Sequence, residues 1–197
     1  LIKPDGGNIF LNGEDITTYA MYRRARKGLN YLPQESSIFK NLTVEENIMA
    51  ILETLKLDEM ERKRRLRELL AELDLTPLSS NWAYSLSGGE RRRVEITRAL
   101  VTAPKYMLLD EPFAGIDPLA IADIQKIIAK LKAKRIGVLV SDHNVRETLS
   151  VCDRAYIVNE GEVLVEGTSE EIACSELARK IYFGENFIFS GKTADRP

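Results

Sequence analysis

Two short apolar runs in the second half of the chain constrain its fold more than any other feature. The runs Tyr106–Asp110 and Ile136–Ser141 contain Met-Leu-Leu and Val-Leu-Val without polar alternation. Strands of a parallel sheet have this pattern when helices cover both of its faces. Helical patterns alternate with the runs at Glu90–Thr102, Pro118–Lys134 and Val145–Val151. The alternation predicts an α/β fold with a largely parallel sheet flanked by helices on both faces.

Further strands are expected on either side of this central part. Gly7–Gly13 reads as a strand between two glycine turns, and a polar helix separates it from a second strand near Leu29–Leu32. After the central part, Ala155–Val158 and Val163–Glu166 flank a turn at Asn159-Glu160-Gly161. These two runs predict a hairpin, and a helical tail is expected behind it.

A helical insert is predicted from Thr43 to about Asp74. Thr43 and Glu46 have the spacing of a capping box, in which each side chain satisfies a backbone N–H of the other residue. Four leucines then recur on one helical face: Leu66, Leu69, Leu70 and Leu73. We therefore expect one domain over residues 1–197, in which residues 43–103 approximately form a helical subdomain.

The composition argues against several classes of partner and site. The chain has 28 Lys and Arg residues against 30 Asp and Glu, a formal net charge of -2, so nothing global favours a polyanionic partner such as nucleic acid. The basic runs Arg62–Arg65 and Arg91–Arg93 lie inside helical patterns and are interpreted as solvated helix faces. Cys152 and Cys174 lack C-x-x-C spacing and neighbouring metal ligands, so no redox or zinc role is assigned and a reducing cytosol fits.

Asp110 and Glu111 are the strongest candidates for chemistry. They stand at the carboxyl end of an apolar strand, where open α/β sheets form their ligand crevices. Asp110 is placed to hold Mg²⁺ directly or through water, because this ion prefers hard oxygen ligands and substrate phosphates. Glu111 can polarise an attacking water as a general base. A pair of solvated carboxylates at a strand end is the alternative interpretation.

The turn Ser87-Gly88-Gly89 comes immediately before a predicted helix. Its glycines let a phosphate approach bare backbone N–H groups, Ser87 adds a hydroxyl, and the helix N-terminus supplies a positive potential. The pattern therefore predicts an anion site. The alternative is a serine N-cap followed by a glycine turn, which is common in proteins of every kind.

Two further residues follow strands of the same predicted sheet. His143, the only histidine, comes after the run that ends at Ser141, so a contact to a terminal phosphate is a hypothesis beside an ordinary structural role. Gln34 follows the strand near Leu29–Leu32. Its amide could ligate Mg²⁺ or orient a water, or it could be an ordinary surface-loop side chain.

The order of these elements resembles the ATP-binding cassette (ABC) ATPase family at every step, over essentially the whole chain. In the family's terms, Gln34 is similar to the Q-loop, Leu86–Glu90 to the signature, Tyr106–Asp110 to the Walker B strand, Ala114–Asp117 to the D-loop and His143 to the switch histidine. The resemblance implies ATP hydrolysis with ATP and Mg²⁺ as ligands and Glu111 and His143 as catalytic residues. It implies nucleotide or metal contacts from the following residues: Gln34, Ser87, Gly88, Gly89, Asp110 and Asp117.

The phosphate-binding Walker A loop of that family, G-x-x-x-x-G-K-[ST], does not occur in the 197 residues. Gly191-Lys192-Thr193 does not complete it, because Asn186 stands where its first glycine is required. The chain starts at Leu1 without a Met, and the resemblance implies that about fifty residues carrying this loop and the adenine-stacking aromatic residue are missing. We expect the chain as it stands to bind ATP poorly and to hydrolyse it little.

Within the family, four segments resemble most the ATPases of lipopolysaccharide export in Gram-negative bacteria: Tyr31–Phe39, Ser85–Ile96, Asp142–Thr148 and Tyr182–Phe187. ATPases of branched-chain amino-acid importers share Asp15-Ile16-Thr17 and have a segment similar to Leu42–Asn47. They are the nearest alternative to an ATPase of lipopolysaccharide export. A soluble ABC ATPase acting on ribosomes or DNA is less favoured, because neither a second cassette nor a long coiled-coil arm occurs in the sequence. Without the phosphate loop, a non-catalytic binding module is a further alternative.

The resemblance also implies partners. In a head-to-tail homodimer, Ser87, Gly88 and Gly89 of one subunit would face ATP held by the other. Two transmembrane permease subunits would dock their coupling helices in a groove between the Gln34 segment and the helical insert, near Gln34–Val44. The apolar residues there include Phe39, Leu42 and Val44, and the alternative interpretation is that they belong to the ordinary core of the subdomain. The apolar stretches of this chain are far shorter than the ~18 residues of a membrane span. We therefore expect a cytoplasmic protein, peripheral on the inner membrane, which contacts the membrane only through its partners.

Overall fold

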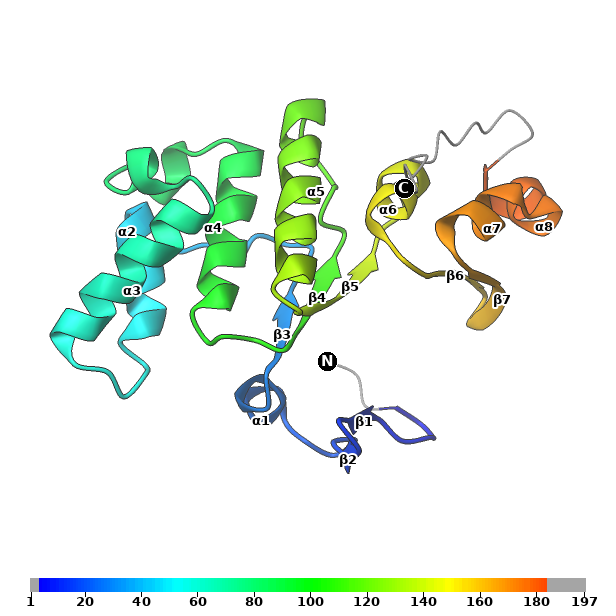
Figure 1. Ribbon diagram of the computed structural model, residues 1–197, viewed down its shortest axis with the longest axis horizontal. Helices are drawn as coiled ribbons and strands as arrows, with labels where there is room; N and C mark the ends of the chain where they lie inside the picture. Colours follow the sequence, from blue (N-terminus) through cyan, green and yellow to red (C-terminus); the bar gives the residue numbers. More distant parts are fainter. Residues whose placement is uncertain (1–3, 184–197) are drawn as a thin grey trace, which may run out of the picture.

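The structure of the chain, a computed structural model, describes residues 4–183 (Figure 1). Its strands are β1 (Phe10–Leu11), β2 (Glu14–Asp15), β3 (Leu29–Leu32), β4 (Tyr106–Asp110), β5 (Gly137–Ser141), β6 (Ala155–Asn159) and β7 (Glu162–Gly167). Its α-helices are α1 (Met21–Arg26), α2 (Val44–Leu52), α3 (Glu59–Glu72), α4 (Gly88–Leu100), α5 (Pro118–Ala133), α6 (Val145–Val151), α7 (Ser169–Cys174) and α8 (Glu176–Ala178). Two 3₁₀ turns (Thr76–Leu78 and Ala83–Ser85) precede α4, and a π-helical turn (Arg179–Phe183) follows α8. Residues 184–187 of the tail resemblance and Gly191-Lys192-Thr193 lie outside the described residues.

A three-stranded parallel sheet in the order β3–β4–β5 lies at the centre of the molecule (Figure 1). Its register pairs Leu32 with Leu109 and Leu109 with Val140, so all three strands end at the same edge. The hairpins β1–β2 and β6–β7 are separate antiparallel pairs. The predicted α/β fold with a largely parallel sheet is confirmed, as is the hairpin that follows it.

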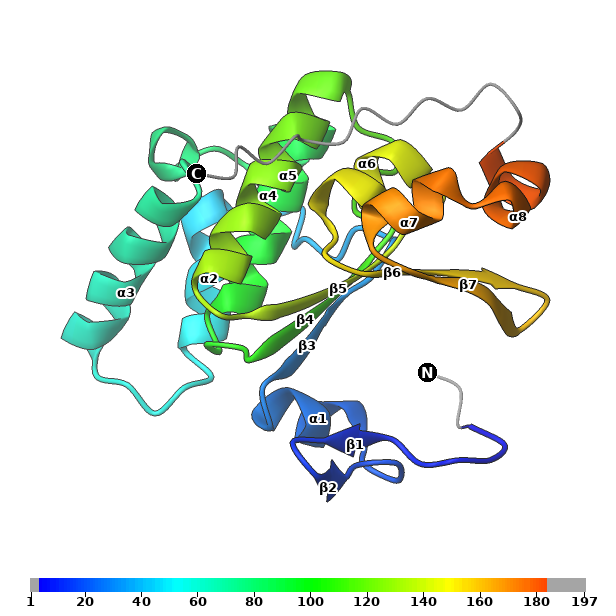
Figure 2. The same cartoon turned by 45° about the vertical axis from the view of Figure 1, so that its right-hand side comes forward.

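The long helices of the central part lie against one face of this sheet. Figure 2 shows α4 and α5 along the same side of β3, β4 and β5. Met107 and Leu109 are 0% and 1% exposed, whereas Leu139 is 61% exposed. Leu108 pairs with Leu139 and shares its face, because side chains alternate along each strand. The prediction that helices cover both faces is therefore wrong for residues 4–183, since an apolar run does not reveal which faces are covered.

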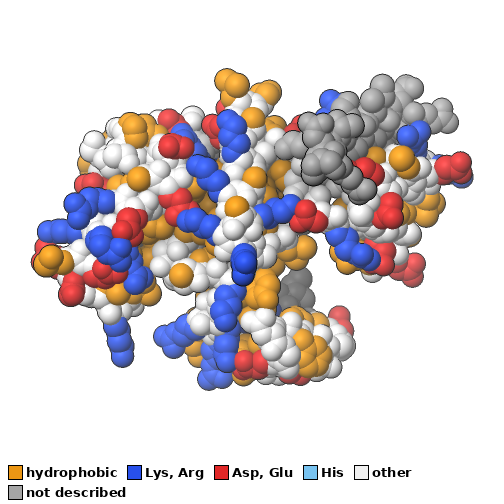
Figure 3. All heavy atoms as spheres, in the orientation of Figure 1, with side chains coloured by type: hydrophobic (Ala, Val, Ile, Leu, Met, Phe, Trp, Pro, Cys, Tyr) orange, Lys and Arg blue, Asp and Glu red, His pale blue; other side chains and the backbone are white. Residues whose placement is uncertain are grey.

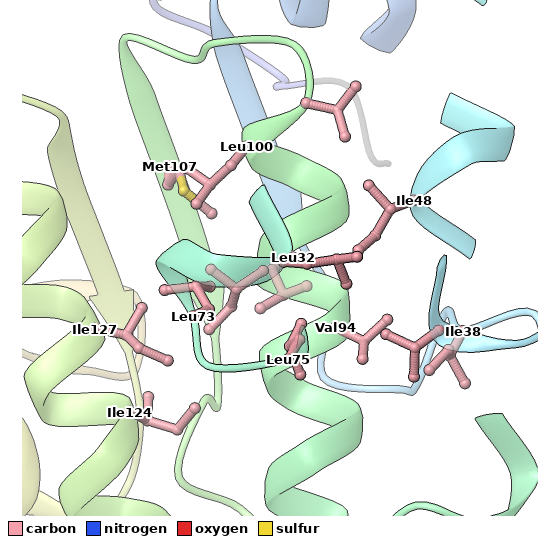
Figure 4. Close-up of a cluster of buried hydrophobic side chains, with 14 of the residues drawn as sticks. Leu32, Ile38, Ile48, Leu73, Leu75, Val94, Leu100, Met107, Ile124 and Ile127 are labelled. Carbon is pink, nitrogen blue, oxygen red and sulfur yellow. The ribbon is translucent and has the colours of Figure 1, made fainter. Parts of the chain in front are cut away.

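One hydrophobic core joins the sheet to the helices (Figure 4). Its buried side chains come from β3, β4, α4, α5 and the segment after α3, and they include Leu32, Met107, Val94, Leu100, Ile124, Ile127, Leu73 and Leu75. Full burial of one such side chain contributes about 1.5–3 kcal/mol. Ile48 of α2 belongs to the same cluster, so the helical part and the sheet share a core. The assignment of residues 43–103 to a subdomain stays a prediction.

The helical insert begins with the predicted capping box. The Thr43 hydroxyl accepts the N–H of Glu46 at 3.2 Å, and the Glu46 carboxylate accepts the N–H of Thr43 at 2.7 Å. The insert contains two helices because Asp58 caps the second one, α3. The predicted apolar face of α3 is buried or packed against the core: Leu66, Leu69, Leu70 and Leu73.

Charged side chains of both signs are interspersed over the face of the molecule in Figure 3. On α3, three residues of the basic run Arg62–Arg65 form ion pairs with Glu59 and Glu61 on the same helix. Pairs on a surface contribute only about 0.2–1 kcal/mol each. This basic run is a solvated helix face, as predicted. Between residues 4 and 183, every helix is too short or too polar to cross a lipid bilayer.

Candidate active site

Four predicted site residues lie together at the carboxyl edge of the sheet. Gln34 comes two residues after β3, and His143 comes two residues after β5. Asp110 is the last residue of β4, and Glu111 is the next residue. The Gln34 Nε2 atom donates to Glu111 Oε2 at 2.7 Å, and His143 Nδ1 lies 3.5 Å from the same oxygen. We call Gln34, Asp110, Glu111 and His143 the strand-end cluster. The parallel register explains the cluster, because it brings three strand ends to one place.

Glu111 has an uncommon backbone conformation. Its φ angle is +42°, in the left-handed region that side chains other than glycine seldom adopt. The N–H of Glu111 donates to the carbonyl of Ser141 at 2.7 Å, which ties the residue to the end of β5. Such a conformation costs of order 1–3 kcal/mol and persists only where the surrounding structure holds it. Here it turns the chain out of the strand direction directly after Asp110.

Two hydroxyl groups hold the Asp110 carboxylate. Ser141 Oγ donates to Oδ1 at 2.6 Å, and the Tyr31 hydroxyl donates to Oδ2 at 2.8 Å. These bonds, with Ser141 the larger cause, keep the pKa of Asp110 below its ordinary value, because they stabilise the anion. Sequence reasoning missed both partners. The strand register could have identified them. Ser141 pairs directly with Asp110, and Tyr31 pairs with Leu108, which shares a face of β4 with Asp110.

The strand-end cluster could hold a magnesium ion together with phosphate. Asp110 supplies carboxylate oxygens and Gln34 an amide oxygen, which are the ligand types that Mg²⁺ prefers. No group of three or more acidic, histidine or cysteine side chains suited to a metal occurs within residues 4–183. Protein sites for Mg²⁺ commonly use one or two carboxylates and leave the other positions to phosphates and water. The donor set therefore fits a cation that arrives with a nucleotide.

His143 stands on a turn that the neighbouring Asp142 stabilises. The Asp142 side chain is fully buried, and it accepts the N–H of Phe113 at 3.0 Å and the N–H of Asn144 at 2.8 Å. The His143 side chain itself is 62% exposed. The imidazole is thus presented to solvent beside Glu111 by a turn that is anchored below it.

The Ser87-Gly88-Gly89 turn is the start of α4. Ser87 is the N-cap: its hydroxyl accepts the N–H of Glu90, and its own N–H donates to the Glu90 carboxylate at 2.8 Å. The helix begins at Gly88, two residues before the predicted start at Glu90, because this capping box brings both glycines into the first turn. The N–H groups of Gly88 and Gly89 are among the donors that a helix start leaves without an intrahelical partner. The serine N-cap of the alternative interpretation is therefore present. The anion site stays a prediction, because a capped helix start also has N–H groups that an anion could accept.

Asp117 lies beside this turn at the start of a second helix. Its Oδ1 accepts the N–H groups of Leu119 and Ala120 at 3.0 Å, and so caps α5. Ser87, Gly89 and Asp117 line one small hollow of about 200 Å³. We call Ser87, Gly88, Gly89 and Asp117 the signature cluster. Within residues 4–183, no hydrogen bond or ion pair joins it to the strand-end cluster.

Arg92 contradicts the interpretation of Arg91–Arg93 as a solvated face. The residue is 7% exposed, and its guanidinium donates to the backbone carbonyls of Pro33 and Asp110, each at 2.8 Å. It also lies 3.3 Å from the Glu95 carboxylate, which is itself 4% exposed. The spacing of Arg92 and Glu95 could have indicated this ion pair, because residues three apart lie on the same face of a helix.

The predicted docking residues have different exposures. Phe39 is 44% exposed and Leu42 is partly buried, but Val44 is 0% exposed and belongs to the core. The prediction that Val44 lines a docking groove is therefore wrong for this structure, and the alternative, an ordinary core residue, is right for it. Val44 is the first residue of α2, and the helix turns its side chain inward. The exposed apolar surface near Gln34–Val44 consists mainly of Phe39, whose ring lies under the Arg98 guanidinium at 4.3 Å.

Comparison with known proteins gives matches over most of the chain. Residues 1–114 match the ABC transporter family. The lipopolysaccharide export system ATP-binding protein LptB of Acidithiobacillus ferridurans is 52% identical over 187 residues, which are 95% of this chain and 78% of that protein. LptB of Escherichia coli (strain K12) is 48% identical over 188 residues, with the same two coverages. The ADP conformation of MJ1267, an ATP-binding cassette of an ABC transporter, matches with a TM-score of 0.81 and 28% identity over 93% of this chain and 79% of that chain.

Proposed function

The chain belongs to the ABC transporter family, and on this premise we propose that it is the ATP-hydrolysing subunit of a transporter that powers lipopolysaccharide extraction from the inner membrane for export. The observation that carries the catalytic part is the meeting of Gln34, Glu111 and His143 at one sheet edge, with contacts of 2.7 and 3.5 Å. The similarity to LptB proteins over 95% of the chain supports the choice of substrate.

Glu111 acts as the general base in the proposed reaction. A water oxygen attacks the γ-phosphorus of ATP, the bond from that phosphorus to the β–γ bridging oxygen breaks, and a water proton passes to the Glu111 carboxylate. ADP and phosphate leave. His143 donates a hydrogen bond to the terminal phosphate, where negative charge must be stabilised. Asp110 and Gln34 would hold a magnesium ion that accompanies ATP, and this ion would neutralise part of the phosphate charge.

The signature cluster serves the nucleotide of a second copy of the chain. Its N–H donors lie at a helix start, and no hydrogen bond joins them to the strand-end cluster within residues 4–183. By the resemblance to the family, Ser87, Gly88 and Gly89 of one subunit contact ATP at the strand ends of the other, with Asp117 at the same interface. ATP closes this dimer by binding both surfaces, and hydrolysis removes the link.

The proposed membrane partners are two permease subunits of the LptF/LptG type. They dock near Gln34–Val44, where Phe39 is the exposed apolar residue and Arg98 lies over its ring. The protein then works at the cytoplasmic face of the inner membrane and contacts it through these subunits. A tagged copy should retain two membrane proteins from detergent extracts and should drive ATP-dependent release of lipopolysaccharide when reconstituted with them. Retention of ribosomes or DNA in physiological salt, or stimulation by a branched-chain amino-acid permease, would overturn the assignment.

The 197 residues alone should hydrolyse ATP poorly, because the sequence contains no G-x-x-x-x-G-K-[ST] loop to cradle the phosphates. The test is a nucleotide titration of the 197-residue chain beside a longer polypeptide in which a segment with this loop precedes Leu1, called the extended chain. We expect tight binding and hydrolysis only in the extended chain. Equal affinity of the two polypeptides for ATP would contradict this proposal.

A further inference from the structure

The helix α4, which starts at the signature cluster, also forms hydrogen bonds to the segment that carries Gln34. Three side chains of α4, spaced three residues apart, face this segment: Arg92, Glu95 and Arg98. The Glu95 carboxylate accepts the Ser36 hydroxyl and the Ser37 N–H, both at 2.7 Å. Arg98 donates to the Ser37 carbonyl at 2.6 Å. The segment after β3 is therefore fixed along the length of one helix face.

Arg92 is the member of this set that reaches the strand-end cluster. It donates to the carbonyl of Pro33, the residue before Gln34, and to the carbonyl of Asp110, the residue before Glu111. Gln34 and Glu111 are the two residues that hydrogen-bond to each other through their side chains at 2.7 Å. One guanidinium thus links the backbone next to Gln34 to the backbone next to Glu111. The separation of these two backbone positions sets the distance between the Gln34 amide and the Glu111 carboxylate.

The chemistry of this contact requires an arginine. Two guanidinium nitrogens, Nη1 and Nη2, each donate at 2.8 Å to a different carbonyl. A lysine keeps the positive charge beside Glu95, but it is a single donor point on a flexible stem and cannot reproduce the planar fork. A buried charge is retained only where hydrogen bonds satisfy it, and here Glu95 and the two carbonyls do so.

We propose that Arg92 is a positioning residue that sets Gln34 against Glu111 and transmits the position of the signature helix to the general base. The proposal rests on the proposed ATPase function. Ser87 caps the helix that carries Arg92. A shift of α4 when the signature cluster meets the second subunit's nucleotide therefore also shifts the carbonyls of Pro33 and Asp110. Occupation of one ATP site in the dimer is thereby linked to the geometry of the base in the other.

The test compares Arg92→Lys with Arg91→Lys in the extended chain. Arg91 is a matched control, because it is the same residue type one position away and its side chain has no hydrogen bond or ion pair within residues 4–183. For Arg92→Lys we expect kcat to fall by about ten- to hundred-fold, because small misplacements of reacting groups have effects of this size. KM for ATP should change less than about threefold, and the melting temperature should fall by only a few degrees, because a buried carbonyl loses its donor. Arg91→Lys should match the parent in all three.

Glu95→Gln gives a second variant, which keeps the shape of the side chain and weakens its hold on Ser36 and Ser37. It should also lower kcat more than it changes KM. Hydrogen exchange in the 197-residue chain supplies a readout that needs no hydrolysis: the Ser37 amide should exchange faster in Arg92→Lys, while amides of α3 keep their protection.

The outcomes separate the two claims. If the extended parent chain has no ATPase activity, the proposed function is wrong. The exchange of the Ser37 amide then still tests whether Arg92 positions the segment that carries Gln34. Parent-like kinetics and exchange in Arg92→Lys would overturn the inference. A variant with lower kcat, higher KM and a much lower melting temperature together would also overturn it, because Arg92 would then be a structural residue only.

Discussion

The strand-end cluster and the signature cluster satisfy their polar groups in opposite ways. Contacts in the strand-end cluster join residues far apart in sequence, such as Tyr31 with Asp110 and Gln34 with Glu111. In the signature cluster the bonds are local: the Ser87 N–H donates to the Glu90 carboxylate, and the Ala120 N–H donates to the Asp117 carboxylate. The first cluster is therefore assembled by the sheet within one subunit. The second is a pair of capped helix starts, at Ser87 and Asp117. Its contact with the nucleotide of another subunit stays a proposal.

The largest effect that separates the clusters is expected from Glu111→Gln in the extended chain. Turnover should fall by about 10²–10⁴-fold, because general-base catalysis contributes that much, while the contacts to phosphate survive. An ATP-bound dimer should accumulate, since the signature cluster is unchanged. Gel filtration with ATP measures this directly, and elution as a monomer only would contradict the assignment of Glu111.

His143→Ala should have the next largest effect. A hydrogen bond to a charged group is worth about 1.5–3 kcal/mol, or roughly ten- to hundredfold in turnover. ATP binding should change less, because the imidazole is 62% exposed and is one contact among several. Steady-state kinetics and ATP titration of the same sample provide the comparison. Unchanged turnover would remove His143 from the catalytic set.

Gly89→Ala tests the packing of the signature cluster in the 197-residue chain. A β-carbon on Gly89 would lie 2.5 Å from the Ala120 β-carbon, so α4 and α5 would have to separate. Overpacking of this kind costs about 1–3 kcal/mol, measured as a lower denaturation midpoint. Gly88→Ala is the matched control, because its added carbon would meet Ile116 at 3.3 Å and needs a smaller adjustment. Adding Ala120→Gly to Gly89→Ala should recover part of the loss, and no recovery would rule out this clash.

The smallest effect concerns the pH dependence of the strand-end cluster. The pKa of Asp110 in the folded chain lies below the ordinary aspartate value of 3.8, so its contribution to stability is complete above pH 3.8 and is lost as the pH falls through the lower folded value. Ser141→Ala removes the larger cause and should lower stability at pH 7. The difference from the parent should shrink as the pH falls below about 3.8.

Urea denaturation between pH 7 and pH 3 measures this effect. Tyr31→Phe removes the second hydroxyl donor to Asp110 and should give the same trend with a smaller amplitude. A stability difference that is independent of pH across this range would show that the serine acts through something other than the Asp110 carboxylate.

The strand-end residues could be located from the sequence, because each follows an apolar run whose pattern identifies it as a strand. The strand Tyr106–Asp110 and the helix Val145–Val151 have the predicted bounds. Their catalytic and ligand roles stay predictions. What the sequence could not provide was the partner of each group, since the hydroxyls of Tyr31 and Ser141 become relevant only through the strand register.

Arg92 and Leu139 show two kinds of information that local patterns lack. Arg92 stands in a run of three arginines that reads as a solvent-facing charge, and its burial depends on carbonyls at Pro33 and Asp110, 59 and 18 residues away. Leu139 sits in an apolar run that suggests full burial, yet it is 61% exposed. Both depend on which elements meet in space, and a pattern of period two or 3.6 does not contain that information.

The central claim is that ATP reacts between the strand-end cluster of one subunit and the signature cluster of another. Two variants of the extended chain, Glu111→Gln and Ser87→Glu, should each be inactive, because one lacks the base and the other places a carboxylate against phosphate. Mixed before ATP is added, they should regain a substantial part of the parent's ATPase rate, since each mixed dimer contains one site in which both clusters are intact. A mixture as inactive as its components, although mixed dimers are shown to form, would contradict a site shared between two chains.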